Sequence, residues 1–413
     1  MKKVLFIANY YYPDVASLGQ LMTEICEALK ERYDITVIAA VPNYSEDINL
    51  DKSLLDKKYY QEEIAGIKVF RVIVPNVNKR SKLSRVNYIK KYYCNAKAAI
   101  KHIKDYDVIF TVSQPPILGG LLGRYAKKLN PKAKLIYNIQ DFNPEQIEAI
   151  GYSKVKPIIS SLRKMDNLTL RDSDCILVVG NDQVETVKKR GEEFLSKVTV
   201  INNWIDESQI FPLSMEDEEV VAFKHKYNLA NKFIVMYSGN LGLFYDLENL
   251  IKAAHHFKHN KDLIFVFAGE GAVKKDLEQY KEVNELSNIL FLPYQPKDKL
   301  NISLNIADVH LVVNAKGIKG VSVPSKLYGV LAVGKPIIGV LESNSEARNI
   351  ITKSNSGKCV NPEDYSGFYK LLEEFYNNRE TIKIMGCKGR AYLEENLTKR
   401  ISMEKYDKLF KEL

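Results

Sequence analysis

The sequence predicts an α/β protein built from two doubly wound domains, each with a parallel sheet. Three observations support this prediction. The chain has 413 residues, which is more than one hydrophobic core usually organises. Short apolar runs alternate with amphipathic stretches, as expected for parallel strands covered by helices on both faces. The alternation lapses once and then restarts, which indicates a second domain.

The first series of alternating segments begins at the first apolar run of the chain. Amphipathic stretches predict helices from about Leu18 to Glu31, within residues 79–104, and near Leu118–Lys128. The predicted strands are Val4–Ala8, Ile35–Ala40, Val69–Ile73, Val108–Val112, Leu135–Ile139, Ile176–Val179 and Val198–Ile201.

The second series follows a polar, acidic stretch around Pro212, where we place the linker. We therefore predict an N-terminal domain over residues 1–212 and a C-terminal domain over residues 213–396. A helix at about residues 397–413 is expected to pack back on the first domain. The predicted strands of the second domain are Phe233–Tyr237, Ile264–Ala268, Ile289–Phe291, Val309–Val313 and Pro336–Val340.

Cysteine usage and hydropathy bear on the cellular location. The five cysteines are scattered and show no Cys-x-x-Cys spacing, which is typical of free thiols in a reducing compartment. The first apolar run ends at Asn9, so we interpret it as a buried strand and not as an export signal. No run approaches the roughly 18 apolar residues that span a bilayer. We expect a cytoplasmic protein, soluble or peripheral to the membrane.

The formal net charge of +9 favours a polyanionic partner. Residues 79–104 contain nine Lys or Arg and no Asp or Glu, interleaved with tyrosines and isoleucines. Such a segment could hold the protein on the anionic inner face of the cell membrane. A solvated helix face without a partner is the alternative. The residues predicted to contact the membrane are Arg85, Lys90, Lys91 and Lys97.

We expect ligand-binding residues in the loops that follow strands, because ligands of doubly wound sheets bind beyond the carboxyl ends of the strands. Each domain has a glycine-bearing turn there, from Tyr11 to Gly19 and from Ser238 to Gly242, and each turn precedes a helix whose amides could hold phosphate. Glycines that merely allow a tight turn are the alternative. Neither loop is a Gly-x-Gly-x-x-Gly fingerprint, and the chain has no P-loop, so hydride transfer and NTP hydrolysis lose support.

A segment after the strand ending near Asn314 combines features of an anion site. Pro324 and Ser325 start a predicted helix, and Lys326 lies in its first turn. A helix start with a hydroxyl and an added cation suits a phosphate group. A capped surface helix is the alternative.

This segment, Val-Pro-Ser-Lys-Leu-Tyr-Gly-Val-Leu-Ala-Val-Gly-Lys-Pro-Ile, resembles the donor-site segment of family 4 glycosyltransferases. It is most similar to the capsule and O-antigen subgroup with fucosamine transferases and colanic-acid transferases. The resemblance covers essentially the whole chain and implies the GT-B fold, two Rossmann-like domains facing across a cleft. Further matching motifs are Tyr237–Gly242, Ser113–Pro116, Gln140-Asp141, Asn203–Asp206 and Phe267–Gly271.

The sequence departs from the wider family in the donor site. The family's two glutamates correspond to Val321 and Gly329, and its diphosphate-binding Arg and Lys correspond to Asn240 and Tyr245. We expect Lys326 to supply the missing cation in binding and catalysis, assisted by Lys316 or Lys319. Glu346 is the expected hydroxyl-binding carboxylate. The predicted donor-binding residues are Gly239, Asn240, Gly242, Gly269, Glu270, Pro324, Ser325, Lys326 and Glu346.

Asp141 follows the strand ending at Ile139 and is the candidate catalytic residue of the first domain, where a carboxylate could orient or deprotonate an acceptor hydroxyl. Helix capping is the alternative, since Pro144 and Glu145 lie just beyond. The predicted acceptor-side residues are Tyr12, Gly19, Ser113, Gln140 and Asp141.

We expect no metal and no cofactor. Two Asp-x-Asp triplets, at residues 105–107 and 172–174, precede strands, so they lie at the wrong sheet edge for a catalytic metal. A helix start with Lys326 could instead stabilise a leaving diphosphate.

The resemblance implies a retaining transferase of hexosyl or N-acetylhexosaminyl groups. The expected donor is a nucleotide-sugar, UDP-activated, and the expected acceptor is a sugar linked to polyprenyl diphosphate, as in capsule, O-antigen or exopolysaccharide synthesis. Two alternatives remain open: a nucleotide-sugar epimerase of the same fold, and a basic nucleic-acid-binding protein. We expect no nucleic-acid partner, because the chain has no recognised binding motif for one.

Overall fold

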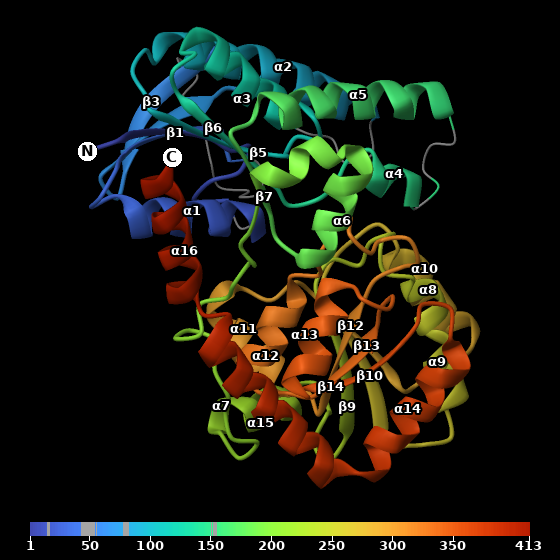
Figure 1. Ribbon diagram of the computed structural model, residues 1–413. Coiled ribbons are helices and arrows are strands. Elements are labelled where there is room, and N and C mark those ends of the chain that lie inside the picture. Colours follow the sequence, from blue (N-terminus) through green and yellow to red (C-terminus); the bar gives the residue numbers. More distant parts are fainter. Residues whose placement is uncertain (15–16, 43–53, 55, 77–81, 150, 152–154) are drawn as a thin grey trace. The chain divides into compact units, whose positions relative to one another are not determined.

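The computed structural model describes residues 1–14, 17–42, 54, 56–76, 82–149, 151 and 155–413 (Figure 1). The chain divides into two compact units. Unit 1 comprises Met1–Glu148, Ser153–Ile201 and Met403–Leu413, and unit 2 comprises Ala149–Tyr152 and Asn202–Ser402. Each unit contains its own sheet.

Unit 1 is built on an eight-stranded sheet in the order β3-β4-β2-β1-β5-β6-β7-β8. The neighbouring strands are parallel except for β3, which runs antiparallel to β4. Strands β1 and β5 are almost wholly buried, as expected for strands covered on both faces. The elements are β1 (Lys3–Ile7), α1 (Ser17–Leu29), β2 (Asp34–Ala40), β3 (Tyr59–Ile64), β4 (Ile67–Val72), α2 (Lys82–His102), β5 (Val108–Val112), α3 (Leu118–Leu129), β6 (Lys134–Ile139), α4 (Glu145–Ala149), α5 (Lys156–Asp172), β7 (Cys175–Val178), α6 (Asn181–Arg190), the 3-10 helix η2 (Glu192–Lys197) and β8 (Val198–Val200).

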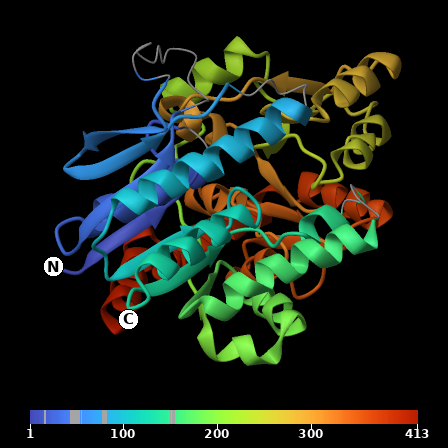
Figure 2. The same ribbon diagram turned by 90° about the horizontal axis from the view of Figure 1, so that it is seen from above.

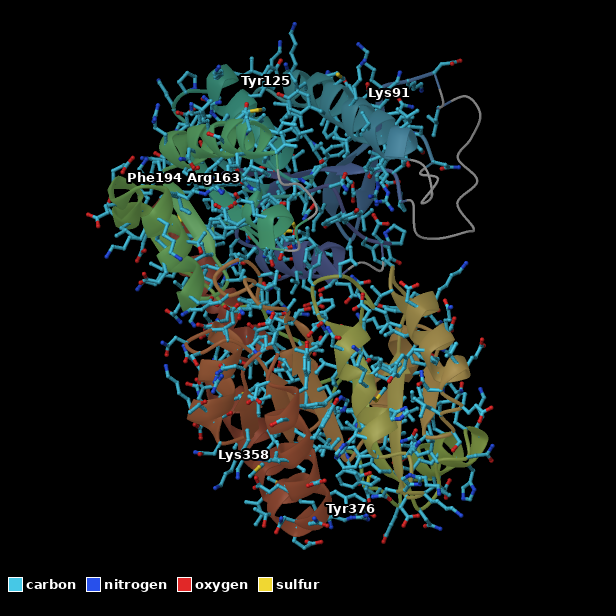
Figure 3. The ribbon with its side chains drawn as sticks, turned by 90° about the vertical axis from the view of Figure 1, so that its right-hand side faces the viewer. Lys91, Tyr125, Arg163, Phe194, Lys358 and Tyr376 are labelled. Carbon is cyan, nitrogen blue, oxygen red and sulfur yellow. The ribbon has the colours of Figure 1, made fainter. Side chains whose placement is uncertain are left out.

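Helices α2, α3 and α5 form one layer over a face of this sheet, and the view from above looks down on them (Figure 2). Their order follows from contacts. Lys97 of α2 stacks on Tyr125 of α3, and Arg124 of α3 pairs with Asp172 of α5. Lys91 and Tyr125 mark the outer side of this layer in Figure 3. We call these three helices the outer layer.

The last helix, α16 (Lys399–Glu412), belongs to unit 1 from Met403 onward. The ring of Phe410 lies edge-on to Phe6, with ring centroids 6.0 Å apart, and to Tyr33 at 5.5 Å. Asp407 accepts a hydrogen bond from the hydroxyl of Tyr33 and forms an ion pair with Arg32. The end of the chain therefore completes the core of unit 1.

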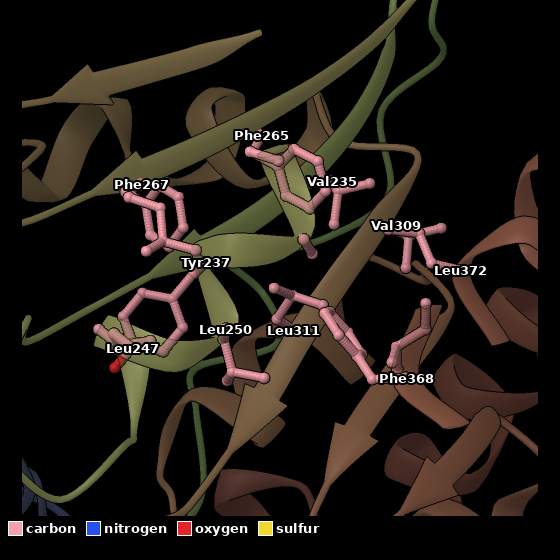
Figure 4. Packing of buried hydrophobic residues seen from close by; sticks show 14 of the residues in the cluster. Val235, Tyr237, Leu247, Leu250, Phe265, Phe267, Val309, Leu311, Phe368 and Leu372 are labelled. Carbon is pink, nitrogen blue, oxygen red and sulfur yellow. The ribbon is translucent and has the colours of Figure 1, made fainter. Parts of the chain in front are cut away.

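Unit 2 is built on a six-stranded parallel sheet in the order β11-β10-β9-β12-β13-β14. Its core packs aromatic and branched side chains of β9, β10 and β12 against Phe368 and Leu372 of α14 (Figure 4). The elements are α7 (Glu218–Lys226), β9 (Phe233–Ser238), α8 (Leu247–Leu250), α9 (Lys252–His256), β10 (Leu263–Ala268), α10 (Lys274–Val283), β11 (Ile289–Leu292), α11 (Lys297–Asn305), β12 (Val309–Val313), α12 (Lys326–Ala332), β13 (Ile337–Val340), α13 (Glu346–Ser354), β14 (Gly357–Val360), α14 (Tyr365–Asn377) and α15 (Arg379–Asn396).

The α/β fold class predicted from the alternating pattern is confirmed, and two edge strands were not predicted. Strand β3 alternates half-buried and exposed residues and contains Glu62 and Glu63, so it has no apolar run to signal it. Strand β14 is short and only partly buried. Both escape a search for buried strands because edge strands are only partly covered.

Candidate functional site

Two glycine loops of unit 2 pack backbone to backbone at the carboxyl ends of β9 and β10. The Gly239 amide donates to the Ala268 carbonyl at 2.9 Å. Gly239 and Gly269 have φ values of 141° and 145°, a region that favours glycine. A Cβ at Gly269 would lie 1.9 Å from the Gly239 carbonyl oxygen. Close packing between the loops therefore already accounts for glycine at position 269.

Lys326 is held against the first of these loops. Its Nζ lies 3.6 Å from the ring centroid of Tyr245 and 4.9 Å from that of Tyr237. A Cβ at Gly239 would lie 3.1 Å from Cε of Lys326, so glycine leaves room for the lysine stem. The hydroxyl of Tyr237 donates to the Asn240 carbonyl at 2.8 Å, which ties the ring to the same loop. The segment starting α12 thus delivers its cation to the loop after β9.

Burial lowers the pKa of Lys326 to about 7. The side chain is half-buried, and no carboxylate among the described residues forms an ion pair with its ammonium group. The faces of Tyr237 and Tyr245 are attractive surfaces for a cation but carry no formal charge. In its protonated form, Lys326 would therefore present to an anion a charge that no carboxylate among the described residues neutralises.

The other two candidate cations are placed differently. Lys316 is exposed and forms an ion pair with Glu363 at 2.6 Å, which raises the pKa of Lys316. Lys319 is also exposed, and its backbone amide donates to Glu342 at 3.0 Å. Glu342 accepts from the Gly317 amide as well, at 2.9 Å, so it holds the loop after β12. Of the three lysines, Lys326 is the one that contacts the tyrosines beside Gly239.

The remaining residues predicted to bind a donor lie around these loops. Asn240 is exposed, and a Cβ at Gly242 would lie 2.8 Å from the Asn240 Nδ2. Glu270 forms an ion pair with Lys274 at 2.7 Å on the surface. Pro324 is buried and Ser325 is exposed directly before α12.

Glu346 begins α13 and is buried, and its Oε1 accepts a hydrogen bond of 2.8 Å from Asn202. Glu346 can bind hydroxyl groups, as predicted, only if a ligand reaches its largely buried carboxylate. That role stays a prediction.

Asp141 of unit 1 is half-buried and follows β6. Helix α4 begins only at Glu145, so Asp141 is not the residue next to a helix start. Gln140 beside it is held on three sides. Its backbone amide donates to the Ser113 hydroxyl oxygen at 3.3 Å, its side chain donates to Asn138 at 2.9 Å, and its carbonyl accepts from Gln183 at 3.1 Å.

A buried arginine that the sequence analysis did not single out holds the loop after Asp141. Arg190 donates to the Asn143 carbonyl at 3.0 Å and to both carboxylate oxygens of Glu145 at 2.6 and 2.5 Å. Burial raises the pKa of the neighbouring Asp166 to about 6, although Arg190 opposes the shift. Residues 145 and 190 are far apart in the chain, and no local spacing indicates their pairing.

The loop after β1 is anchored by a second buried arginine. Arg71 on β4 is 1% exposed, donates to the carbonyl oxygens of Tyr12 and Ala40, and pairs with Glu62 at 2.6 Å. Tyr12 itself is 56% exposed, whereas Gly19 is buried in α1. A Cβ at Gly19 would lie 3.2 Å from the Asp14 carbonyl oxygen, so glycine allows this helix to approach the loop.

The residues predicted to contact a membrane fall into two groups. Arg85, Lys90 and Lys91 are exposed on α2. Lys97 is half-buried, because its Nζ lies 4.5 Å from the ring centroid of Tyr125. Lys97 therefore connects α2 to α3 and does not project freely from the outer layer. Lys79 and Arg80 of the basic segment lie outside the described residues.

The Asp-x-Asp triplets lie at the amino ends of β5 and β7, where lysines and arginines pair with them. Asp105 pairs with Lys3, and Asp174 pairs with Lys127. In the part of the chain that the structure describes, no group of three or more His, Cys, Asp or Glu could hold a metal ion. No helix of these residues is long and apolar enough to cross a bilayer. Metal independence stays a prediction.

Comparison with known proteins identifies unit 2. Residues 220–392 match the family model described as Glycosyl transferases group 1. Unit 2 carries a group 1 glycosyltransferase domain. The resemblance found in the sequence motifs is confirmed, and glycosyl transfer is the activity class of the chain.

Relatives and solved structures agree with this glycosyltransferase assignment. The chain is 26% identical over 336 residues to WbjE of Pseudomonas aeruginosa, described as a probable glycosyltransferase, with 80% of this chain and 81% of WbjE covered. It is also 26% identical to WcaI of Escherichia coli K12, named for colanic acid biosynthesis, with 87% and 89% covered. Anabaena HepE, solved with UDP and glucose, matches with a TM-score of 0.75 at 13% identity over the full length of both chains. The GT-B fold is confirmed.

Proposed function

We propose that this glycosyltransferase moves a hexosyl or N-acetylhexosaminyl group from a UDP-sugar to a lipid-linked oligosaccharide during synthesis of a capsule, O-antigen or exopolysaccharide. The observation that carries the proposal is the ammonium group of Lys326, held 3.6 Å from the Tyr245 ring centroid beside the Gly239 loop. A cation without a carboxylate partner at a strand-end glycine loop is suited to a diphosphate.

Lys326 would bind the donor diphosphate and stabilise the charge that develops on it as the glycosidic bond breaks. A hydrogen bond to a charged group contributes about 1.5–3 kcal/mol. Tyr245 stands where the wider family has a lysine, and the Lys326 ammonium group lies over its ring. Lys326 would therefore bring a positive charge to the region that the family's lysine serves. We propose a retaining outcome without a metal ion.

Asp141 would orient or deprotonate the acceptor hydroxyl from unit 1. The hydrogen bonds that hold Gln140 and the Arg190 contacts to Asn143 and Glu145 keep the loop around Asp141 in one arrangement. A fixed carboxylate suits general base catalysis, because proton transfer needs hydrogen-bond geometry to the reacting hydroxyl.

The relatives motivate the donor and acceptor classes. HepE was solved with UDP and glucose, and WcaI is named for colanic acid biosynthesis. We infer UDP as the nucleotide and a polyprenyl-diphosphate-linked sugar as the acceptor. The exposed cations Arg85, Lys90 and Lys91 of α2 would hold unit 1 at the anionic inner face of the cell membrane.

Incubation of the purified protein with radiolabelled UDP-sugars, with and without lipid-linked acceptor and with and without chelator, tests the proposal. We expect label in the lipid fraction only when acceptor is present, and equally with chelator. Conversion of the sugar without any acceptor would identify an epimerase instead. A strict need for magnesium or manganese would contradict the metal-free mechanism.

A further inference from the structure

Helix α5 presents large apolar side chains to solvent. Ile158 is 54% exposed, Met165 36% and Leu168 37%, and Val155 just before the helix is 50% exposed. Positions 158, 165 and 168 follow helical spacing and lie along one strip of the helix. A different side of α5 is buried and includes Ile159. We call Ile158, Met165 and Leu168 the α5 strip.

Contacts between α3 and the last turns of α5 show which side of α5 carries the strip. Residue 172 follows 158 and 165 at heptad spacing, and Asp172 pairs with Arg124 of α3 at 2.6 Å. Thr169 lies against Gly120 of α3, where an added Cβ would come within 2.8 Å of it. The strip therefore lies on the side of α5 that carries Asp172, its C-terminal end adjoins α3, and its side chains are exposed.

The outer layer is cationic. Helices α2 and α3 contain no acidic residue, and α5 contains two. Of these two, Asp166 is 2% exposed and Asp172 is engaged by Arg124. The exposed cations of the layer include Lys90, Lys91, Lys128, Lys156, Lys164 and Arg171.

Other exposed apolar side chains accompany these cations in the outer layer. Leu83 and Val86 in the first turns of α2 are 82% and 61% exposed, and Leu129 at the end of α3 is 47% exposed. A nucleic acid would neutralise the cations and leave these apolar side chains in water. A bilayer with anionic headgroups neutralises the cations and also buries apolar side chains at the acyl boundary.

We propose that α5 is a membrane-inserting element of this protein, with the α5 strip entering the acyl boundary of an anionic bilayer beside the cations of the outer layer. The inference rests on the proposed location at the inner face of the membrane. The inference adds an apolar contribution to membrane binding. This contribution comes from α5, which lies outside the basic segment of residues 79–104 that predicted the membrane location. Charge contacts are screened by salt and apolar burial is not, so the two contributions can be separated.

Vesicle sedimentation tests the inference with vesicles of phosphatidylglycerol and phosphatidylcholine. The test variant replaces the strip, Ile158→Ser with Met165→Ser and Leu168→Ser. The matched control replaces exposed apolar residues of unit 2, Val283→Ser with Ile384→Ser, which are 73% and 57% exposed. At roughly 0.5 M salt, where charges are strongly screened, wild type and control should stay bound and the strip variant should bind at least tenfold more weakly.

Tryptophan quenching reports insertion without removing any apolar side chain. Met165→Trp should lose fluorescence when the vesicle lipids carry bromine on their acyl chains, and Ile384→Trp should not. The buried Trp204, the single tryptophan of the sequence, contributes equally to both variants. Equal quenching of the two variants would overturn the inference.

The remaining outcomes separate this inference from the proposed location. Wild type that binds anionic vesicles at low salt, but is released at high salt together with the strip variant, would overturn insertion of α5 and leave charge-driven binding intact. Wild type that ignores anionic vesicles altogether would overturn both. An unchanged circular dichroism spectrum and an unchanged urea-unfolding midpoint of the strip variant show that unit 1, which carries α5, is folded.

Discussion

Donor binding should weaken as the pH rises through the pKa of Lys326. Burial lowers this pKa to about 7, so the free protein carries an ammonium group below pH 7 and a neutral amine above it. A bound diphosphate favours the charged form and raises the pKa, so binding above pH 7 takes up a proton. By linkage, affinity then falls with increasing pH.

The size of the effect follows from the protonated fraction. At pH 8.5, about 1.5 units above the pKa, roughly one Lys326 in 30 is protonated in the free protein. The dissociation constant of a UDP-sugar should therefore be about 30-fold higher at pH 8.5 than below pH 6, a difference of about 2 kcal/mol. A UDP-sugar is the right probe because its diphosphate is esterified at both ends and keeps its charge over this range.

Calorimetry across pH 6–8.5, in buffers of different ionisation enthalpy, measures both the affinity and the proton uptake. Lys326→Arg is the matched control, because a guanidinium stays charged throughout and its profile should be flat. A wild-type affinity that is independent of pH, or the same slope in Lys326→Arg, would refute the assignment of this group to the diphosphate.

Three further predictions concern the same sites. The pKa of Lys326 is lowered in the folded state, so protonated Lys326 destabilises the fold below pH 7, and this cost fades as the pH rises toward 10. The Lys326→Met variant should therefore resist urea better than wild type at pH 6, with a smaller difference at pH 10. A difference that is the same at both pH values would exclude the buried charge as its cause. Asp141→Asn should lower turnover about 100-fold with unchanged UDP affinity, whereas lost stability with normal specific activity would support a purely structural role. Arg190→Met should destabilise unit 1 by about 3–5 kcal/mol, because it removes two hydrogen bonds from the largely buried Glu145 carboxylate and leaves it the longer contact to Arg163. The double variant with Glu145→Gln should regain stability in the same denaturation assay, and equal losses in both would contradict this reasoning.

The parts of the fold that could be predicted are those with local signals. Strand β5 is a run of five residues, all buried, and such a run needs helices on both sides. The loop that follows such a strand in a βα unit lies at the carboxyl edge of the sheet, so the positions of the Gly239 and Asp141 loops could be predicted from the sequence. Strand β3 has no such run, because its alternating pattern reflects an edge of the sheet.

The site's pairings could not be predicted, because they depend on residues brought together by the fold. Lys326 was a candidate from its own motif, but nothing in the sequence indicates that its ammonium group lies over the Tyr245 ring. The same holds for Arg190, which reaches Glu145 across 45 positions of chain. The sequence also does not show whether a lysine of a helix is exposed or packed against a neighbour. Lys91 and Lys97 lie in the same basic helix, yet Lys97 stacks on Tyr125 and Lys91 is exposed.

The second half of α16 makes the polypeptide of unit 1 discontinuous, and this affects the order in which the protein can be made. The ribosome releases the residues of unit 2 before it releases Phe410 and Asp407, which pack against Phe6 and Tyr33. Unit 2 can therefore fold while unit 1 still waits for its last helix. Residues 202–402 are an almost uninterrupted stretch suited to expression alone, whereas an N-terminal fragment ending near residue 201 would expose the apolar surface that α16 covers. Supplying residues 399–413 as a separate peptide would be a direct way to restore that fragment.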